Sequence, residues 1–197
     1  MSKLSSRELS ILARRFMRER MRVWKAEKRY YSQANSLDEA IDIALGLRDN
    51  DRIPSHQCRV GRVALSRAGR LLKERFRSLR KARNFEELHS ILARIAAEVP
   101  RFGKLATYDI AHRLGIYFGM KPELVYLHAG TKEGASAIGI FGSAVDLKKF
   151  PKPLQIMSAT QLEDFLCICK SALQGSVSFN QACSELSRSC VSRGSIC

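Results

Sequence analysis

The sequence predicts an all-α fold, a helical bundle, from three observations. Apolar residues recur three and four positions apart along most of the chain. Capping boxes precede several of these stretches, beginning at Ser5, Ser36, Asn84 and Thr160. No alternating apolar pattern runs longer than four or five residues. Because apolar residues make up 45% of the 197 residues, the chain can bury a core of packed helices.

The expected helices follow from these signals in chain order. In the first half of the chain they span about 5–31, 37–47, 57–82 and 85–98. A polar segment with a proline predicts a loop at 48–55. In the second half we expect helices at about 105–118, 122–128, 132–138, 161–174 and 180–191. Pro122 suits the first position of its helix, and Thr131 suits the N-cap of the next.

Basic residues are concentrated in the first part of the chain. The formal net charge is +15, and residues 1–83 carry +13 of it. We therefore divide the chain into a basic helical region, 1–83, and a second helical region, 84–197, packed together as one globular unit. A polyanion is the natural partner of such a surface, because neutralised phosphates release condensed counterions. A solvated helix face and a basic helix on a membrane surface are the alternative interpretations.

Composition narrows the class of protein further. No apolar run approaches the roughly 20 residues that span a bilayer, and the first residues lack an apolar signal core. Six cysteines are too few for a disulfide scaffold of this size. We expect a reduced, cytoplasmic protein with no membrane partner. The sequence gives no basis for an oligomeric state.

Residues 85–118 contain two amphipathic stretches joined by Val99-Pro100-Arg101-Phe102-Gly103-Lys104. This segment resembles the helix-hairpin-helix motif of DNA-binding proteins, whose pattern is an apolar residue, Pro, Gly, an apolar residue and Gly. Arg101 stands where the motif has its first glycine. The resemblance implies that the amides at the start of the second helix bind one phosphate of double-stranded DNA. The DNA-binding residues it implies, with two from the basic region, are Arg101, Phe102, Gly103, Lys104, Arg62 and Arg70.

The same hairpin is found in the superfamily of DNA glycosylases similar to endonuclease III. The lyase lysine of that family corresponds here to Leu105, and no carboxylate stands at 126–128, where its catalytic Asp would fall. The resemblance therefore implies a monofunctional glycosylase that excises a damaged or modified base, without lyase activity.

Other residues would have to supply that chemistry. Asp109, which shares a helix face with His112 and Arg113, and His128 are the catalytic candidates. Tyr108 and Tyr126 are the candidates for stacking on the base. The structural alternatives are an Asp109–Arg113 pair within one helix, a structural histidine and tyrosines of the core.

No cofactor or metal is expected. Cys183, Cys190 and Cys197 have the first spacing of an iron–sulfur loop but lack its close pair of cysteines. Two functions of other classes stay open beside the glycosylase. They are a nucleic-acid-binding module without catalysis and an arginine-rich bundle that binds an acidic protein.

Overall fold

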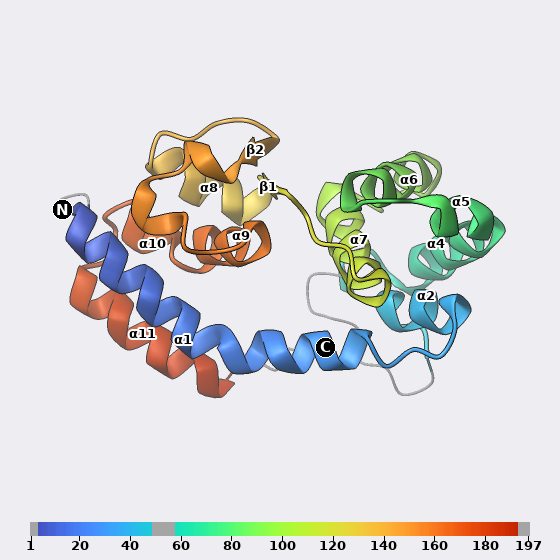
Figure 1. Ribbon diagram of the computed structural model, residues 1–197, viewed down its shortest axis with the longest axis horizontal. Coiled ribbons are helices and arrows are strands. Elements are labelled where there is room, and N and C mark those ends of the chain that lie inside the picture. The colour runs from blue at the N-terminus through green and yellow to red at the C-terminus, as the bar shows by residue number, and fades with distance from the viewer. Residues whose placement is uncertain (1–3, 49–57, 193–197) are drawn as a thin grey trace. The chain divides into compact units, whose positions relative to one another are not determined.

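The computed structural model describes residues 4–48 and 58–192, and it is predominantly helical (Figure 1). The all-α expectation is confirmed. Within these residues the strands are β1 (Leu124–Tyr126) and β2 (Ala144–Asp146), a short antiparallel pair with Val125 opposite Val145. None of the helices in this part of the chain combines the length and the apolar character that crossing a membrane requires. Except for Arg48, the loop expected at 48–55 lies outside the described residues.

The chain divides into two compact units. The hairpin unit comprises residues 25–48 and 58–122 and is named for the turn that joins its last two helices. The strand unit comprises residues 4–24 and 123–192 and is named for its two short strands. One boundary falls inside α1 (Ser6–Tyr31), between Trp24 and Lys25. The division expected at residue 83 lies within the hairpin unit, because the basic helices pack against the helices that follow them.

The hairpin unit contains short helices with clear start signals. They are α2 (Leu37–Leu45), α4 (Arg62–Glu74), α5 (Phe76–Lys81), α6 (Phe85–Glu98) and α7 (Lys104–Phe118). The side chains of Ser36 and Asn84 accept hydrogen bonds from the amides of Glu39 and Glu87, so they cap α2 and α6. The bounds of α6 match the expected ones, and α7 begins one residue before its expected start.

The single helix expected over 57–82 is wrong, because α4 and α5 are separated at Arg75. That residue departs from helical geometry, with φ −93° and ψ 22°. The apolar spacing continues across the break through Leu72, Phe76 and Leu79. Periodicity therefore carries no signal for an interruption of one residue.

The core of the hairpin unit lies between α7 and its neighbours α2 and α6. Its fully buried side chains include Leu65, Leu72, Leu79, Phe85, Leu88, Leu92, Ile110 and Leu114. Arg113 of α7 is also buried, with 6% of its surface exposed. Its Nη1 donates to the carbonyl of Ala44 at 3.0 Å, and its guanidinium lies 5.3 Å from the ring centroid of Tyr31. A buried charge is tolerated here because a carbonyl and an aromatic face receive it.

The strand unit combines α1 with the C-terminal half of the chain. After β1 come α8 (Ala129–Ala137), β2 and the 3₁₀ turns η1 (Leu147–Lys149) and η2 (Lys152–Leu154), then α9 (Ala159–Ile168), α10 (Lys170–Leu173) and α11 (Phe179–Ser192). The helix expected over 161–174 is divided at Cys169. The helix expected over 132–138 begins instead at Ala129, so Thr131 lies inside its first turn.

The helix expected at 122–128 is wrong, because this segment forms β1. Pro122 is a buried residue that precedes the strand, and not the first residue of a helix. A β-branched and an aromatic residue, Val125 and Tyr126, favour the extended form that pairs with β2. Leu124 pairs with Asp146, 22 residues later in the chain, so no local pattern predicts the pairing.

Aromatic rings and one carboxylate hold α1 to α9 in the strand unit. The ring of Phe16 lies edge-on to the ring of Phe165, with centroids 5.3 Å apart. The indole nitrogen of Trp24 donates to Oδ2 of Asp164 at 2.7 Å, and Arg20 reaches the same oxygen at 3.3 Å. These contacts fix the N-terminal part of α1 on the core of this unit.

Candidate nucleic-acid interface

The connection between α6 and α7 is a compact turn of five residues, 99–103. Val99 and Phe102 are buried, with 2% and 3% of their surfaces exposed, so they anchor the turn in the core. The amide of Phe102 donates to the carbonyl of Val99 at 3.2 Å, and Pro100 lies exposed between them. Phe102, which the resemblance places among the DNA-binding residues, is thus a core residue. The turn therefore presents its other residues to the outside.

Arg101 occupies a backbone conformation that favours glycine. Its φ is +69°, which places it in the left-handed region. Such a conformation costs a non-glycine residue about 1–2 kcal/mol. The position is the one at which the helix-hairpin-helix pattern has glycine, so this chain departs from the pattern in residue type but adopts a backbone that glycine would favour.

The start of α7 is open. Gly103 is its N-cap residue, with φ −80° and ψ −179°, and no side chain caps the helix. A Cβ atom added at Gly103 would meet nothing within 4 Å. Gly103 and Lys104 are exposed, and the first turn of α7 carries no acidic residue. The first amides of a helix have no partner within it, so this end offers donors and partial positive charge.

A hydrogen bond joins the turn to the most basic segment of the chain. Nη2 of Arg101 donates to the carbonyl of Arg59 at 2.7 Å. Residues 58–83, which begin there, hold ten Lys or Arg and a single acid, Glu74. We call this stretch the basic segment. It contains α4 and α5, and both pack against α6 (Figure 1).

Some cations of the basic segment are neutralised and others are not. Lys73, Arg75 and Arg83 form ion pairs with Asp42, Glu98 and Glu87. Arg62, Arg67 and Arg70 are exposed, and none of them has an ion-pair partner among residues 4–48 and 58–192. Arg67 and Arg70 lie on the face of α4 away from its buried residues Leu65 and Leu72, and Arg62 is the first residue of the helix. The predicted contacts Arg62 and Arg70 thus belong to an uncompensated basic surface.

The other candidates in the hairpin unit, Tyr108 and Asp109, lie on α7. Tyr108 is a core residue, with 3% exposed, and its ring lies parallel to that of His112 and edge-on to that of Phe85. Stacking on a base would require this ring to leave the core. Asp109 is half-buried, and Arg113, its expected partner, donates instead to Ala44.

His128 and Tyr126 belong to the strand unit, so neither unit contains both catalytic candidates. His128 is the N-cap of α8, and its amide donates to Oγ1 of Thr131 at 2.7 Å. Its Nε2 lies 3.7 Å from Oε1 of Glu163, and both side chains are more than four-fifths buried. Tyr126 is half-buried on β1. No local pattern indicates that Glu163 lies beside His128, because Glu163 approaches from a different helix, α9.

Two of the described cysteines, Cys167 and Cys169, have raised thiol pKa values. Burial raises the pKa of the Cys169 thiol well above its ordinary value. Burial, followed by the charge of Glu163, raises the pKa of Cys167. In the described part of the chain, no three His, Cys, Asp or Glu side chains gather as a metal site would require. The side chains of Cys190 and Cys197 lie outside the described residues.

A surface hollow of about 360 Å³ lies on the hairpin turn, lined by residues 96–103. Glu98 is the carboxylate in that lining, and the lining contains no tyrosine. Phe102, the aromatic residue of the lining, is buried, so the hollow exposes no ring on which a base could stack.

Comparison with known proteins adds no relationship to these observations: no protein-family model, no curated protein and no solved structure matches the chain.

Proposed function

We propose that the chain binds double-stranded DNA through the hairpin unit. The start of α7 contacts one phosphate, and the basic segment follows the neighbouring backbone. The observation that supports this most is the hydrogen bond from Arg101 to Arg59, which joins an uncapped helix start to a surface of unneutralised arginines. Helix amides bind phosphate through donors and dipole, and each neutralised phosphate adds counterion release.

Gly103 is informative because neither packing nor backbone strain requires glycine there. Its φ of −80° is open to any residue, and nothing lies within 4 Å of the position of a Cβ atom. The missing side chain leaves the amides of α7 accessible to a bulky anion. By contrast, α2 and α6 of the same unit start with Ser36 and Asn84, which occupy their amides, and with acids in the first turn.

The variant Gly103→Asp tests the proposal. The new carboxylate caps α7 and repels a phosphate, so duplex affinity should fall about tenfold or more while the fold is kept. Gly103→Asn is the matched control, because it caps the helix without adding charge. Its duplex affinity should lie between that of the wild type and that of Gly103→Asp. Ser36→Asp adds the same charge at a helix start that is already capped and should leave affinity unchanged.

The measurement is fluorescence anisotropy with a short labelled duplex over a series of salt concentrations. If about five cations contact phosphates, the logarithm of the binding constant falls with a slope of about −4 to −5 against the logarithm of salt. Wild-type affinity in Gly103→Asp, or an equal loss in Ser36→Asp, would show that α7 does not contact the phosphate.

A second candidate function is excision of a modified base. It is favoured by the half-buried Asp109, which lies on α7 about 9 Å along the helix axis from Gly103. Incubation with duplexes that carry modified bases, followed by alkali, should then give strand cleavage in the wild type and none in Asp109→Asn, with equal duplex affinity. His128→Gln tests the other candidate in the same assay. No product from the wild type on any base would leave DNA binding without catalysis.

A further inference from the structure

The loop that joins α8 to β2 exposes an aromatic ring in the strand unit. Phe141 has 72% of its surface exposed, although the preceding Ile140 packs partly against the core. Gly139 and Gly142 flank these two residues with φ of +80° and +139°. Both values favour glycine, so the loop has a backbone specified by its sequence. Burial of a phenylalanine ring is favourable, so a ring held out on a loop of defined backbone is available to a ligand.

Hydrogen bonds on the side of α8 hold the loop in place. The amides of Ile138 and Ile140 both donate to the carbonyl of Ala135, at 3.1 and 2.9 Å, and the amide of Gly139 donates to Ser136 at 3.0 Å. These bonds close the end of α8 and turn Ile140 inward. The next residue, Phe141, is directed outward as a consequence.

Three exposed lysines follow in the next turns of the chain. Lys148, Lys149 and Lys152 lie on η1 and η2, whose position is fixed by the buried side chains of Phe150 and Leu154. The side-chain amide of Gln155 donates to the carbonyls of Lys148 and Phe150, at 3.1 and 2.7 Å, and holds the two turns together.

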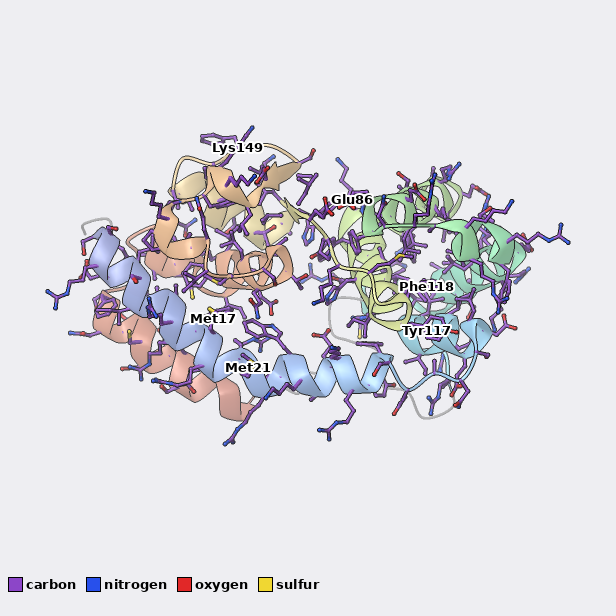
Figure 2. The ribbon with its side chains drawn as sticks, viewed as in Figure 1. Met17, Met21, Glu86, Tyr117, Phe118 and Lys149 are labelled. Carbon is purple, nitrogen blue, oxygen red and sulfur yellow. The ribbon has the colours of Figure 1, made fainter. Side chains whose placement is uncertain are left out.

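The ring and the lysines lie close together along the chain. Lys148 follows Phe141 by seven residues, so their Cα atoms are at most about 25 Å apart. In Figure 1 the loop between α8 and β2 runs along the edge of the strand unit, and Figure 2 shows Lys149 at that same edge.

We propose that Phe141 stacks on an unpaired base of a nucleic-acid strand while Lys148, Lys149 and Lys152 contact its phosphates. This inference rests on the proposed function and names a second contact, for single-stranded or locally opened DNA. The chemistry of the surface favours this occupant, because a nucleotide combines a flat apolar face with a negative charge beside it. The exposed apolar surface here is too small for a hydrophobic protein partner. Within residues 138–156 the strongly exposed large apolar residues are Phe141 and Ile156, and Ile156 is 45% exposed.

The test compares two ligands and three substitutions of the full chain. Anisotropy is measured with a labelled single strand and with the perfect duplex of the same sequence, and circular dichroism verifies the fold. Phe141→Ser should weaken binding of the single strand about tenfold or more, the size of change that loss of one base stack produces. Phe141→Leu keeps the apolar character but not the aromatic face, and it should lose nearly as much. Phe141→Trp should retain or raise the affinity.

Duplex binding separates this inference from the proposed function. We expect the three substitutions to leave perfect-duplex affinity within about twofold, because α7 and the basic segment are unchanged. If the wild type binds duplex and Gly103→Asp does not, while Phe141→Ser binds single strand normally, the stacking contact is wrong and the hairpin contact stands. Full retention by Phe141→Leu would also overturn stacking. If the wild type binds neither ligand, both proposals fail.

Discussion

Four glycines, two from each unit, have different roles, although crowded glycines also occur in the hairpin unit, at Gly69 and Gly115. In the strand unit, Gly134 lies where α8 crosses α9, and a Cβ atom there would stand 2.1 Å from the carbonyl oxygen of Leu166. Gly130 is similarly crowded by Sγ of Cys167 at 2.8 Å. In the hairpin unit, a Cβ atom at Gly103 or Gly61 would meet nothing within 4 Å. One set of glycines allows helices to approach each other, and the other leaves helix starts open.

This difference separates stability from binding. A glycine that permits close packing contributes to the folded state, because any side chain would push two backbones apart. Gly61 has a φ of +85° and is explained by its backbone, whereas Gly103 is explained by neither packing nor conformation. An open position of that kind, beside arginines without ion-pair partners, is available for a ligand. The following predictions test the contrast.

The largest effect should come from Gly134→Ala. Because the obstacle to the new methyl group is backbone and not a flexible side chain, α8 and α9 must separate. We expect a loss of about 3 kcal/mol in the free energy of unfolding, at the upper end of the range for overpacked cores. Gly103→Ala is the control, with an expected loss below about 1 kcal/mol, since the position is open and only a weak N-cap preference is lost. Urea denaturation of both variants measures the difference, and equal stabilities would contradict the packing argument.

An intermediate effect is expected at Arg101, where backbone and side chain make opposite contributions. Arg101→Ala keeps the left-handed strain and removes the hydrogen bond to Arg59, so it should destabilise the chain by about 1 kcal/mol. Arg101→Gly removes the same bond but also the strain, and it should be nearly neutral. Thermal denaturation distinguishes them. If glycine is no better tolerated than alanine, the left-handed conformation of the turn is not a constraint on stability.

Local patterns predicted some helices of this fold closely and missed the breaks in others. The apolar spacing and cap of α6 lie within its own sequence, from Asn84 onward, and its bounds were predicted to the residue. The strand at Leu124–Tyr126 was missed, because β1 exists only through pairing with residues 144–146. The breaks at Arg75 and Cys169 were missed because the apolar period continues across both.

The candidate site was predictable only where its residues are neighbours in the sequence. The turn at 99–103 was predicted because its residues are contiguous, although the burial of Val99 was not. The link from Arg101 to Arg59 spans 42 residues and has no signature in the sequence. The exposure of Phe141 was not predicted either. Its exposure depends on the backbone at Gly139 and Gly142, which hydropathy does not register.

The smallest effect should come from a surface pair of the strand unit, Lys170 with Glu133, which are 2.8 Å apart. Such a pair satisfies a cation locally, unlike the arginines of α4, so Lys170→Met should leave DNA affinity unchanged and lower the thermal midpoint only slightly. The hydrogen bond to Glu133 raises the pKa of Lys170 above its ordinary value of 10.5. The pair therefore stabilises the fold fully at pH values below the pKa that Lys170 has in the unfolded chain. This stabilisation disappears as the pH rises through the pKa that Lys170 has in the folded chain. The difference in midpoint between wild type and variant should be constant near neutral pH and shrink in strong alkali.

Arg70→Gln is the counterpart in the hairpin unit, and it should leave the thermal midpoint unchanged and weaken the duplex complex. If Lys170→Met weakened DNA binding as much as Arg70→Gln does, paired and unpaired cations would not differ in their contribution to binding.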